Sequence, residues 1–387
     1  MNVFITGCTG FLGGEILMLL AQKKEIKKIY CLIRANTQQD AHTRLQKVFS
    51  LHNDYFDTKK IIPILGNLGE DGLAESLIEN EELKDINVII HSAANTSFSK
   101  IYDAVVEKVN ILGLNEIIWW SKSLTQLQTF VYVGTATIVG KGETDRLIFE
   151  YESPNPHSQH FVKYTYTKMM GEIMLKESLP NEKILIVRPS IIMGDSRGIV
   201  PRSNVILWTL AAVNMLRLIP VRSTPPLDII SVDFAAKAIV ALLFAKRNHT
   251  VYHISAGKES CTTNTKLIEA IDPYFTDKPD FKFVDKSLLN QIKLWAKNKL
   301  PDKNAELYQY QEYLDYWEET FENKTDLRIL FGGMDPYIEF IDLGQIFDNT
   351  KLLEDTGIEA PEPVHQYIKR SIAYLAKIDI MEGAIDP

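Results

Sequence analysis

Two side chains at helical spacing, Tyr164 and Lys168, form the part of this sequence best suited to acid–base chemistry. Positions i and i+4 share one face of a helix, so the lysine ammonium can lie beside the phenol. A nearby positive charge lowers the pKa of a phenol, which can then act as a general acid close to neutral pH. The spacing alone is a weak signal. A chain with 16 tyrosines gives about one such pair by chance, and Tyr55 and Lys59 form a second pair.

Position separates the two pairs. Tyr164 follows an apolar run at 130–133, which ends in Gly134 and Thr135. The Thr135 hydroxyl could share a substrate oxygen with the phenol. Tyr55 precedes the expected strand 61–65 without such a hydroxyl, and we interpret it as part of a surface loop. We therefore expect Thr135, Tyr164 and Lys168 to be the catalytic residues; the alternative is a helix face packed on a sheet.

A glycine-rich turn marks the N-terminus. The sequence Thr-Gly-Cys-Thr-Gly-Phe-Leu-Gly at 6–13 follows an apolar run and precedes an expected helix at 15–21. Glycine permits backbone angles that side chains forbid and lets amides approach a pyrophosphate closely. A strand before the turn and a helix after it predict a dinucleotide site at Gly7, Gly10 and Gly13.

The end of the second expected strand indicates which nicotinamide cofactor binds. An acid at this position usually hydrogen-bonds the ribose diol of NAD, whereas an arginine accommodates a 2′-phosphate. Here Arg34 stands 21 positions after Gly13, and Arg44 could add a second positive charge. We therefore expect NADPH; the alternative is a solvated arginine at a strand end.

Composition excludes several classes of protein. The formal net charge of −8 argues against general nucleic-acid binding. Three cysteines without close spacing exclude a disulfide framework or a zinc cluster, and we predict no metal. The apolar stretch 205–221 contains Asn214 and Arg217, so we expect no transmembrane span. The first strand begins near residue 3, which leaves no room for a targeting segment, so we expect a cytoplasmic protein.

Apolar, β-branched runs alternate with helical patterns over the first two-thirds of the chain. The expected strands are 2–6, 28–33, 61–65, 88–91, 130–133, 184–187 and 251–254. This rhythm predicts an α/β fold with a doubly wound parallel sheet of the Rossmann type. We expect a nucleotide-binding domain at 1–255, with an insertion at 195–227 that joins a smaller, mostly helical substrate lobe at 256–387. A C-terminal helix is expected at about 364–376.

Further motifs accompany these residues: Cys31–Ala35 at a strand end, His91-Ser92-Ala93-Ala94, Asn110, and Arg-Pro-Ser-Ile-Ile-Met-Gly-Asp at 188–195. Together they resemble the extended short-chain dehydrogenase/reductase superfamily over about residues 1–260. Within it the chain is most similar to thioester reductases, the branch that holds fatty acyl reductases and the terminal reductase domains of carboxylic acid reductases and nonribosomal peptide synthetases. The implied cofactor-binding residues are Gly7, Thr9, Gly10, Phe11, Leu12, Gly13, Arg34, Arg44, Asn67, Leu68, Ala93, Ala94, Asn95, Tyr164, Lys168 and Pro189.

Two positions depart from the family pattern. The family usually has Gly-Asp after the third strand, where this chain has Asn67, and commonly Ser-Thr where this chain has Gly134 and Thr135. Neither change removes a catalytic group. We interpret His91 as structural.

The resemblance implies NADPH-dependent reduction of an acyl thioester to an aldehyde, with onward reduction to the alcohol left open. Thr135 and Tyr164 would hydrogen-bond the oxyanion, and Lys168 would hold the pKa of Tyr164 down and bind the nicotinamide ribose. We expect a biosynthetic enzyme whose acyl donor is CoA or a carrier protein on another chain. Alternatives within the superfamily are a carbonyl reductase or dehydrogenase and a nucleotide-sugar epimerase; outside it, a non-catalytic NADP(H)-sensing regulator.

Two segments could serve an acyl substrate on a carrier. Residues 199–221, with Trp208, Leu210, Met215 and Leu218, could line an apolar channel, or form a plain core helix. A lysine-rich segment at 281–303 could dock an acidic carrier, or be a solvated helix face. Its lysines are Lys282, Lys286, Lys293, Lys297, Lys299 and Lys303.

Overall fold

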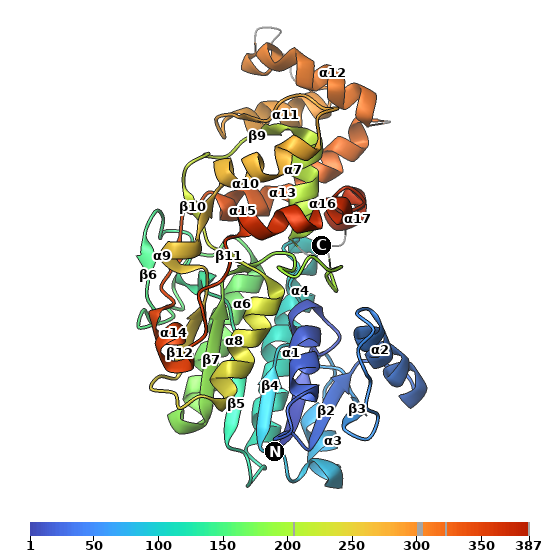
Figure 1. Ribbon diagram of the computed structural model, residues 1–387, viewed down its shortest axis with the longest axis vertical. Coiled ribbons are helices and arrows are strands. Elements are labelled where there is room, and N and C mark those ends of the chain that lie inside the picture. The colour runs from blue at the N-terminus through green and yellow to red at the C-terminus, as the bar shows by residue number, and fades with distance from the viewer. Residues whose placement is uncertain (204–205, 300–304, 322, 386–387) are drawn as a thin grey trace.

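A parallel sheet of seven strands forms the lower half of the molecule in Figure 1. The computed structural model describes residues 1–203, 206–299, 305–321 and 323–385. In spatial order the strands are β12 (Val251–Ile254), β7 (Ile184–Pro189), β5 (Thr129–Val133), β4 (Val88–His91), β1 (Asn2–Thr6), β2 (Lys28–Ile33) and β3 (Ile61–Leu65). All neighbours pair in parallel. The predicted doubly wound fold is confirmed, and its strand order reverses between β1 and β4, where such sheets bind ligands.

Both faces of the sheet are covered because successive strand residues point to opposite sides. In β1, Val3 and Ile5 join one buried cluster, with side chains from α1 (Phe11–Ala21), α2 (Gln38–Ser50) and α8 (Val232–Phe244). Phe4 joins the opposite cluster, with α3 (Leu73–Glu79), α5 (Gly113–Ser121) and α6 (Lys163–Ser178). The strands are therefore apolar throughout, as expected for a sheet buried on both sides.

A helical lobe stands above the carboxyl ends of the strands (Figure 1). It has its own apolar core, which is separate from the two clusters on the sheet. Its helices are α7 (Leu207–Leu216), α10 (Asn264–Ile271), α11 (Leu288–Ala296), α12 (Gln311–Thr320), α13 (Lys324–Ile341), α15 (Val364–Tyr367), α16 (Ile372–Leu375) and α17 (Ile380–Ile385).

The remaining elements are short. Four two-stranded ladders pair β8 (Ile191–Ile192) with β11 (Ile229–Ile230), β9 (Leu218–Ile219) with β14 (Lys282–Phe283), β10 (Pro226–Leu227) with β13 (Thr262–Thr263), and β6 (Leu147–Ile148) with β15 (Ile346–Phe347). The short helices are α4 (Asp103–Glu107), α9 (Gly257–Ser260) and α14 (Thr350–Thr356).

Two details differ from the sequence-based expectation. Helix α1 begins at Phe11, within the glycine-rich sequence 6–13 and four residues earlier than expected. The helix expected at about 364–376 is present over 364–375, but its middle turn, Ile368–Ser371, is a 3₁₀ segment between α15 and α16. The reason is tertiary, since this stretch is fastened to the loop after β8 by Tyr367, which donates to Met193 O at 2.7 Å, and by Arg370, which donates to Ser196 O at 2.8 Å.

The end of the chain also returns to the sheet. Helix α14 falls inside the lobe expected at 256–387, yet it packs beside α8 and β12, as Figure 1 shows. Leu352 is fully buried in the sheet cluster, and Asp355 accepts from the Tyr252 hydroxyl at 2.6 Å. The nucleotide-binding half is therefore completed by residues that come late in the sequence.

Candidate active site

Helix α6, which carries Tyr164 and Lys168, lies directly along β5. Lys168 donates from Nζ to the carbonyl oxygen of Val133, the last residue of β5, at 2.7 Å. The Tyr132 hydroxyl donates to the carbonyl oxygen of Lys168 at 3.1 Å. A Cβ at Gly171 would lie 2.3 Å from that hydroxyl, so glycine is required for α6 to approach the strand this closely.

The loop after β5 brings a hydroxyl to the same place. Thr135 is 8% exposed, and its Oγ1 lies 3.0 Å from the Oγ1 of Thr137. Thr135, Tyr164 and Lys168 all line one cavity. The three predicted catalytic side chains thus line the same cavity.

Burial sets the ionisation of the pair on α6. It raises the pKa of Tyr164 to about 12 and lowers the pKa of Lys168 to about 7. The sequence predicts that the lysine lowers the pKa of the phenol. The structure shows the opposite direction, because burial removes both groups from water and disfavours the charged form of each. Tyr164 therefore holds its proton at neutral pH, while Lys168 titrates there.

The glycine turn connects β1 to α1 and packs against the residues that follow β4. Gly7 has φ +73°, and a Cβ there would lie 2.6 Å from the backbone nitrogen of Ala93. A Cβ at Gly13 would lie 2.1 Å from the carbonyl oxygen of Gly7. The turn is therefore a cradle without side chains at the start of α1, where free backbone amides favour an anion. This donor set fits the pyrophosphate of a dinucleotide.

Two arginines lie at the far end of this cradle. Arg34 is exposed at the end of β2, and Arg44 on α2 donates to its carbonyl oxygen. Both line the main cavity and an adjoining cavity of about 770 Å³, together with Asn67. The Asn67 amide accepts from Gly69 N at 3.2 Å and donates to Glu70 at 3.2 Å. The guanidinium groups place positive charge where a ribose phosphate could bind.

Asn110 holds the loop after β4 against the catalytic helix. It lies on a π-helical turn, Lys108–Leu112, a geometry common at functional sites. Its side chain accepts from Asn95 N at 2.8 Å, and donates to Asn95 O and to Thr167 Oγ1, both at 3.0 Å. Asn110 is 3% exposed. One buried amide thus fixes the spacing between a cofactor loop and α6.

His91 is buried at the end of β4. Its Nδ1 lies 3.2 Å from Thr6 Oγ1, which in turn accepts from Ala93 N at 3.2 Å. Burial, with a smaller contribution from Lys168, lowers the pKa of His91 to about 3. A ring that stays neutral in a bonded position is consistent with the structural role expected for it.

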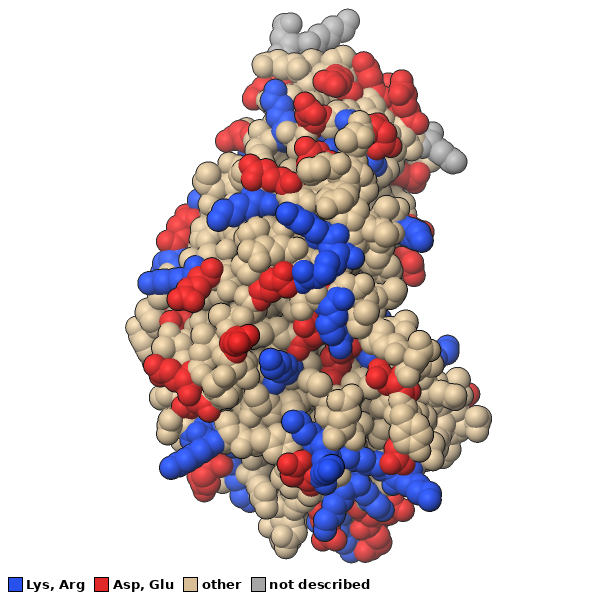
Figure 2. All heavy atoms as spheres, viewed as in Figure 1, with Lys and Arg blue, Asp and Glu red and all other residues tan. Residues whose placement is uncertain are grey.

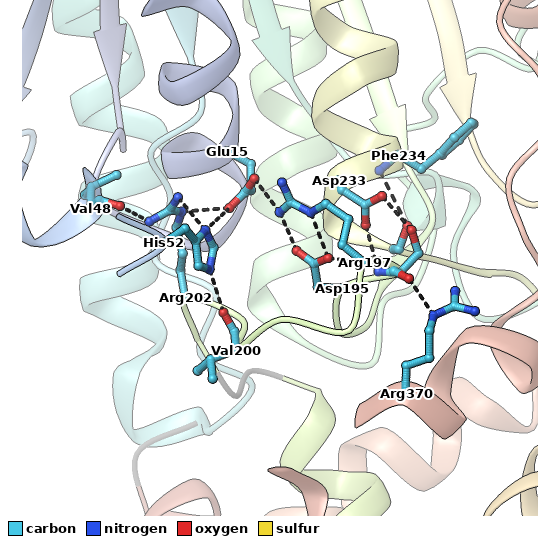
Figure 3. A network of polar contacts seen from close by, with 12 residues as sticks. Glu15, Val48, His52, Asp195, Arg197, Val200, Arg202, Asp233, Phe234 and Arg370 are labelled. Atoms are coloured by element: carbon cyan, nitrogen blue, oxygen red, sulfur yellow. Dashed lines mark hydrogen bonds and ion pairs between the residues drawn. The ribbon is translucent and has the colours of Figure 1, made fainter. Parts of the chain in front are cut away.

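A loop that follows β8 and carries Arg197 and Arg202 lies beside Glu15 of α1 (Figure 3). Glu15 on α1 is 3% exposed and accepts from Arg197 and from Arg202 Nε, each at 2.8 Å. Arg202 also donates to Val48 O and to His52 Nδ1. Asp233 holds the loop from the α8 side through Ser196. The loop is therefore anchored to α1, α2 and α8.

All the predicted catalytic and cofactor-binding residues line a single cavity of about 1090 Å³. The structure adds lining residues that sequence reasoning missed: Phe98, Ser190, Arg202, Tyr337 and Phe340. Phe98 closely follows the motif at 91–94, which is a signal that could have found it. Tyr337 and Phe340 come from the aromatic-rich lobe, whose spacing alone does not indicate which rings reach the site.

The segment expected to line a channel does so in part. Leu210 and Leu218 line the cavity, whereas Trp208 is packed in the lobe core beside Tyr337 and Met215 accepts a contact from Lys278. Positions 204 and 205 of this stretch lie outside the described residues.

Two lysines of the lysine-rich segment are engaged in ion pairs with the helical lobe, whereas Lys282, Lys297 and Lys299 are exposed. Lys286 pairs with Glu339, and Lys293 with Asp335, both on α13. Lys303 lies outside the described residues. On the face drawn in Figure 2, basic and acidic side chains lie interspersed.

Among the described residues, no helix is both long and apolar enough to cross a membrane. Within the same part of the chain, no three His, Cys, Asp or Glu side chains gather in a way that could hold a metal ion.

Several known proteins are similar to this chain in sequence or fold. A component of the linear gramicidin synthase of Brevibacillus parabrevis is 28% identical to this chain. The match covers 71% of this chain and 5% of that protein. Fatty acyl-CoA reductase wat of Drosophila melanogaster is 28% identical over 50% of this chain and 43% of its own length. The chain therefore spans less than half the length of these curated relatives. The terminal R domain from the myxalamid PKS-NRPS biosynthetic pathway shares the fold, with a TM-score of 0.72 and 20% identity over 97% of this chain and 90% of that domain.

A family model described as "Male sterility protein" matches residues 5–239. The match includes the glycine turn, Asn110 and the whole of α6, and it extends over more than half of the sequence. The chain therefore belongs to the male sterility protein family.

Proposed function

We propose that this protein is an NADPH-dependent reductase that converts an acyl thioester to an aldehyde. The observation that carries the proposal is the shared cavity: Thr135, Tyr164 and Lys168 line the same space as the glycine turn and Arg34. The names of relatives support the thioester as substrate, since one is a fatty acyl-CoA reductase and another a component of linear gramicidin synthase.

The reaction consumes one thioester, one NADPH and one proton, and it yields an aldehyde, a free thiol and NADP⁺. When bound, the cofactor supplies the hydride that reduces the carbonyl carbon. The carbonyl oxygen gains negative charge as this happens, and donors already in place stabilise it. Thr135 and Tyr164 are donors that line this cavity. Thr137 supports this role, because its hydroxyl at 3.0 Å can donate to Thr135 while Thr135 donates to the substrate.

Tyr164 then supplies the proton. Its raised pKa of about 12 keeps the phenol protonated at neutral pH. A charged Lys168 would ease release of that proton and could hydrogen-bond the cofactor ribose. The tetrahedral hemithioacetal collapses with loss of the thiol, which breaks the carbon–sulfur bond. Whether a second round yields the alcohol depends on whether the aldehyde leaves first.

The cofactor preference follows from charge. Arg34 and Arg44 place two guanidinium groups at the end of β2, and such groups recognise phosphate through paired hydrogen bonds. This favours NADPH over NADH. An epimerase of the same fold would retain NAD, for which an arginine at this position is unfavourable.

The test combines two readouts with acyl-CoA and carrier-loaded acyl thioesters. NADPH oxidation and thiol release should rise together, and their ratio gives the number of hydrides transferred per thioester. Tyr164→Phe and Thr135→Ala should each lower turnover by about 10² or more, with little change in NADPH affinity. NADPH oxidation with ketones or aldehydes alone would assign the protein to the carbonyl reductases. Binding without turnover of any substrate would indicate a regulator.

A further inference from the structure

The cavity continues from the cofactor cleft into the helical lobe. Beyond Ser203 it is lined by side chains of α7, α10, α13 and the short strands between them. We call this part the lobe chamber; its apolar residues are Ile206, Leu210, Val213, Leu216, Leu218, Ile219, Pro220, Val221, Leu227, Ile229, Leu267, Ile268, Phe283, Phe331, Met334, Ile338 and Ile341. Its walls are therefore built mainly from aliphatic side chains.

Charge is confined to the other end of the cavity. Arg34, Arg44, Lys168 and Arg202 line the cofactor end, but no described residue that lines the lobe chamber is charged. Its polar groups already bond to the protein: Thr209 donates to Ile206 O at 2.6 Å, and Asn264 donates to Arg222 O at 2.8 Å.

Four neighbouring aromatic rings line the cavity, the Tyr164 phenol among them. The Phe98 ring stacks on Tyr337 at 4.7 Å between centroids, lies 5.1 Å from Phe340 and lies 6.1 Å from Tyr164. We call these four residues the aromatic collar. Phe98 comes from the loop after β4, and the two lobe rings come from α13, so the collar joins the two halves of the molecule at the catalytic phenol.

We infer that the acyl group is an unbranched hydrocarbon chain that passes through the aromatic collar into the lobe chamber. The inference rests on the proposed function and names its substrate class. A peptide would bring N–H and C=O groups into walls that have few partners for them, and an unpaired buried amide is costly. A methylene chain needs none, and its burial drives binding.

The aromatic collar and the part of the lobe chamber farthest from the sheet would contact different parts of the substrate. Phe98 packs beside Tyr164, so it faces the carbons next to the thioester and disfavours bulky substituents there. Strand β9 and helix α10 lie farther from the sheet than β11 (Figure 1). Ile268 on α10 therefore belongs to the wall that limits chain length.

The first test measures binding without chemistry. S-alkyl-CoA thioethers from ethyl to octadecyl cannot be reduced, and calorimetry on the full chain gives their dissociation constants. We expect affinity to rise by up to about fourfold per added methylene until the chamber is filled. The chain length at which the affinity stops rising should be shorter in Ile268→Trp and longer in Ile268→Ala. An affinity independent of length in the unmodified protein would overturn the inference, whatever the variants do.

The second test uses turnover. Decanoyl-CoA should exceed N-acetylphenylalanyl-CoA in kcat/KM, and Phe98→Ala should reduce that ratio by at least about tenfold by admitting the bulky α-substituent. A preference for the aminoacyl thioester would overturn the inference while leaving the proposed function intact. Conversely, length-dependent thioether binding without reduction of any thioester would refute the proposed function and keep the chamber as a hydrocarbon site.

Discussion

Lys168 donates a hydrogen bond to the carbonyl oxygen of Val133 at 2.7 Å, in a site where the lysine is only 3% exposed. This one contact ties the helix of Tyr164 to the strand that leads to Thr135. It also explains the ionisation of Lys168, because a single neutral carbonyl offsets little of the cost of burying a charge. The pKa of Lys168 should therefore rise, and the lysine gain a proton, when a ligand brings stronger hydrogen-bond acceptors to its Nζ.

The first prediction concerns that proton. If Lys168, whose pKa is about 7, hydrogen-bonds the ribose of bound NADPH, the complex raises its pKa and binding takes up a proton. Between pH 7 and pH 9 the affinity should then weaken as pH rises, by up to about tenfold per pH unit. Calorimetry in buffers of different ionisation enthalpy measures the uptake directly. Lys168→Arg, which stays charged, is the control and should show none; equal uptake in both proteins would refute this role.

The second prediction tests cofactor selectivity at β2. Arg34→Ala should raise the Kd for NADPH by about 10-fold to 100-fold, because a charge-assisted contact with the 2′-phosphate is lost. The Kd for NADH should change by less than about twofold. Lys28→Ala is a matched control, since it removes one exposed positive charge from the other end of the same strand. Fluorescence titration of both cofactors decides, and parallel weakening of NADPH and NADH would exclude a phosphate contact.

The third prediction concerns Asn110. Asn110→Leu keeps the approximate volume but leaves the backbone of Asn95 and the hydroxyl of Thr167 without their partner. We expect the free energy of unfolding to fall by about 3 kcal/mol, as several buried polar groups lose hydrogen bonds together. Urea denaturation with an unchanged slope measures the loss. A change below about 0.5 kcal/mol would show that water replaces the amide, and that the loop does not depend on it.

The sheet was predictable because its strands are apolar on both faces and punctuated by turns. The seven expected ranges all correspond to strands, with β5 starting one residue earlier at Thr129 and β7 continuing to Pro189. Local pattern decides such elements. The C-terminal helix was also expected, but its 3₁₀ turn was not: Tyr367 and Arg370 contact the loop after β8 there, and no local pattern reports a partner so distant in sequence.

The candidate site divides in the same way. Residues that belong to short motifs, such as the glycine turn and the pair on α6, could be named from spacing. The aromatic collar could not, because Phe98 and Tyr337 meet only after the lobe folds over the sheet. The ionisation of Tyr164 was also hidden, since burial raises its pKa and burial is a property of the whole fold.

The last prediction concerns a buried ion pair behind the catalytic helix. Arg188 on β7 donates to Glu172 on α6 at 2.6 and 2.9 Å, and both side chains are 1% exposed. Burial pushes the pKa of Glu172 upward, but Arg188 and Lys176 outweigh it and hold that pKa below its usual range. The contribution of Glu172 to the free energy of unfolding is therefore present above the unfolded pKa of about 4.3 and is lost as pH falls through the folded value.

Glu172→Met alone should lower the free energy of unfolding by about 3–5 kcal/mol, because Arg188 is left charged and unpaired. The double variant with Arg188→Met should cost less than the sum of the two single variants, and it should lose less stability on acidification than the unmodified protein. Urea unfolding from pH 7 to pH 4 provides all four corners of this cycle; strictly additive losses would show that the two side chains do not stabilise α6 as a pair.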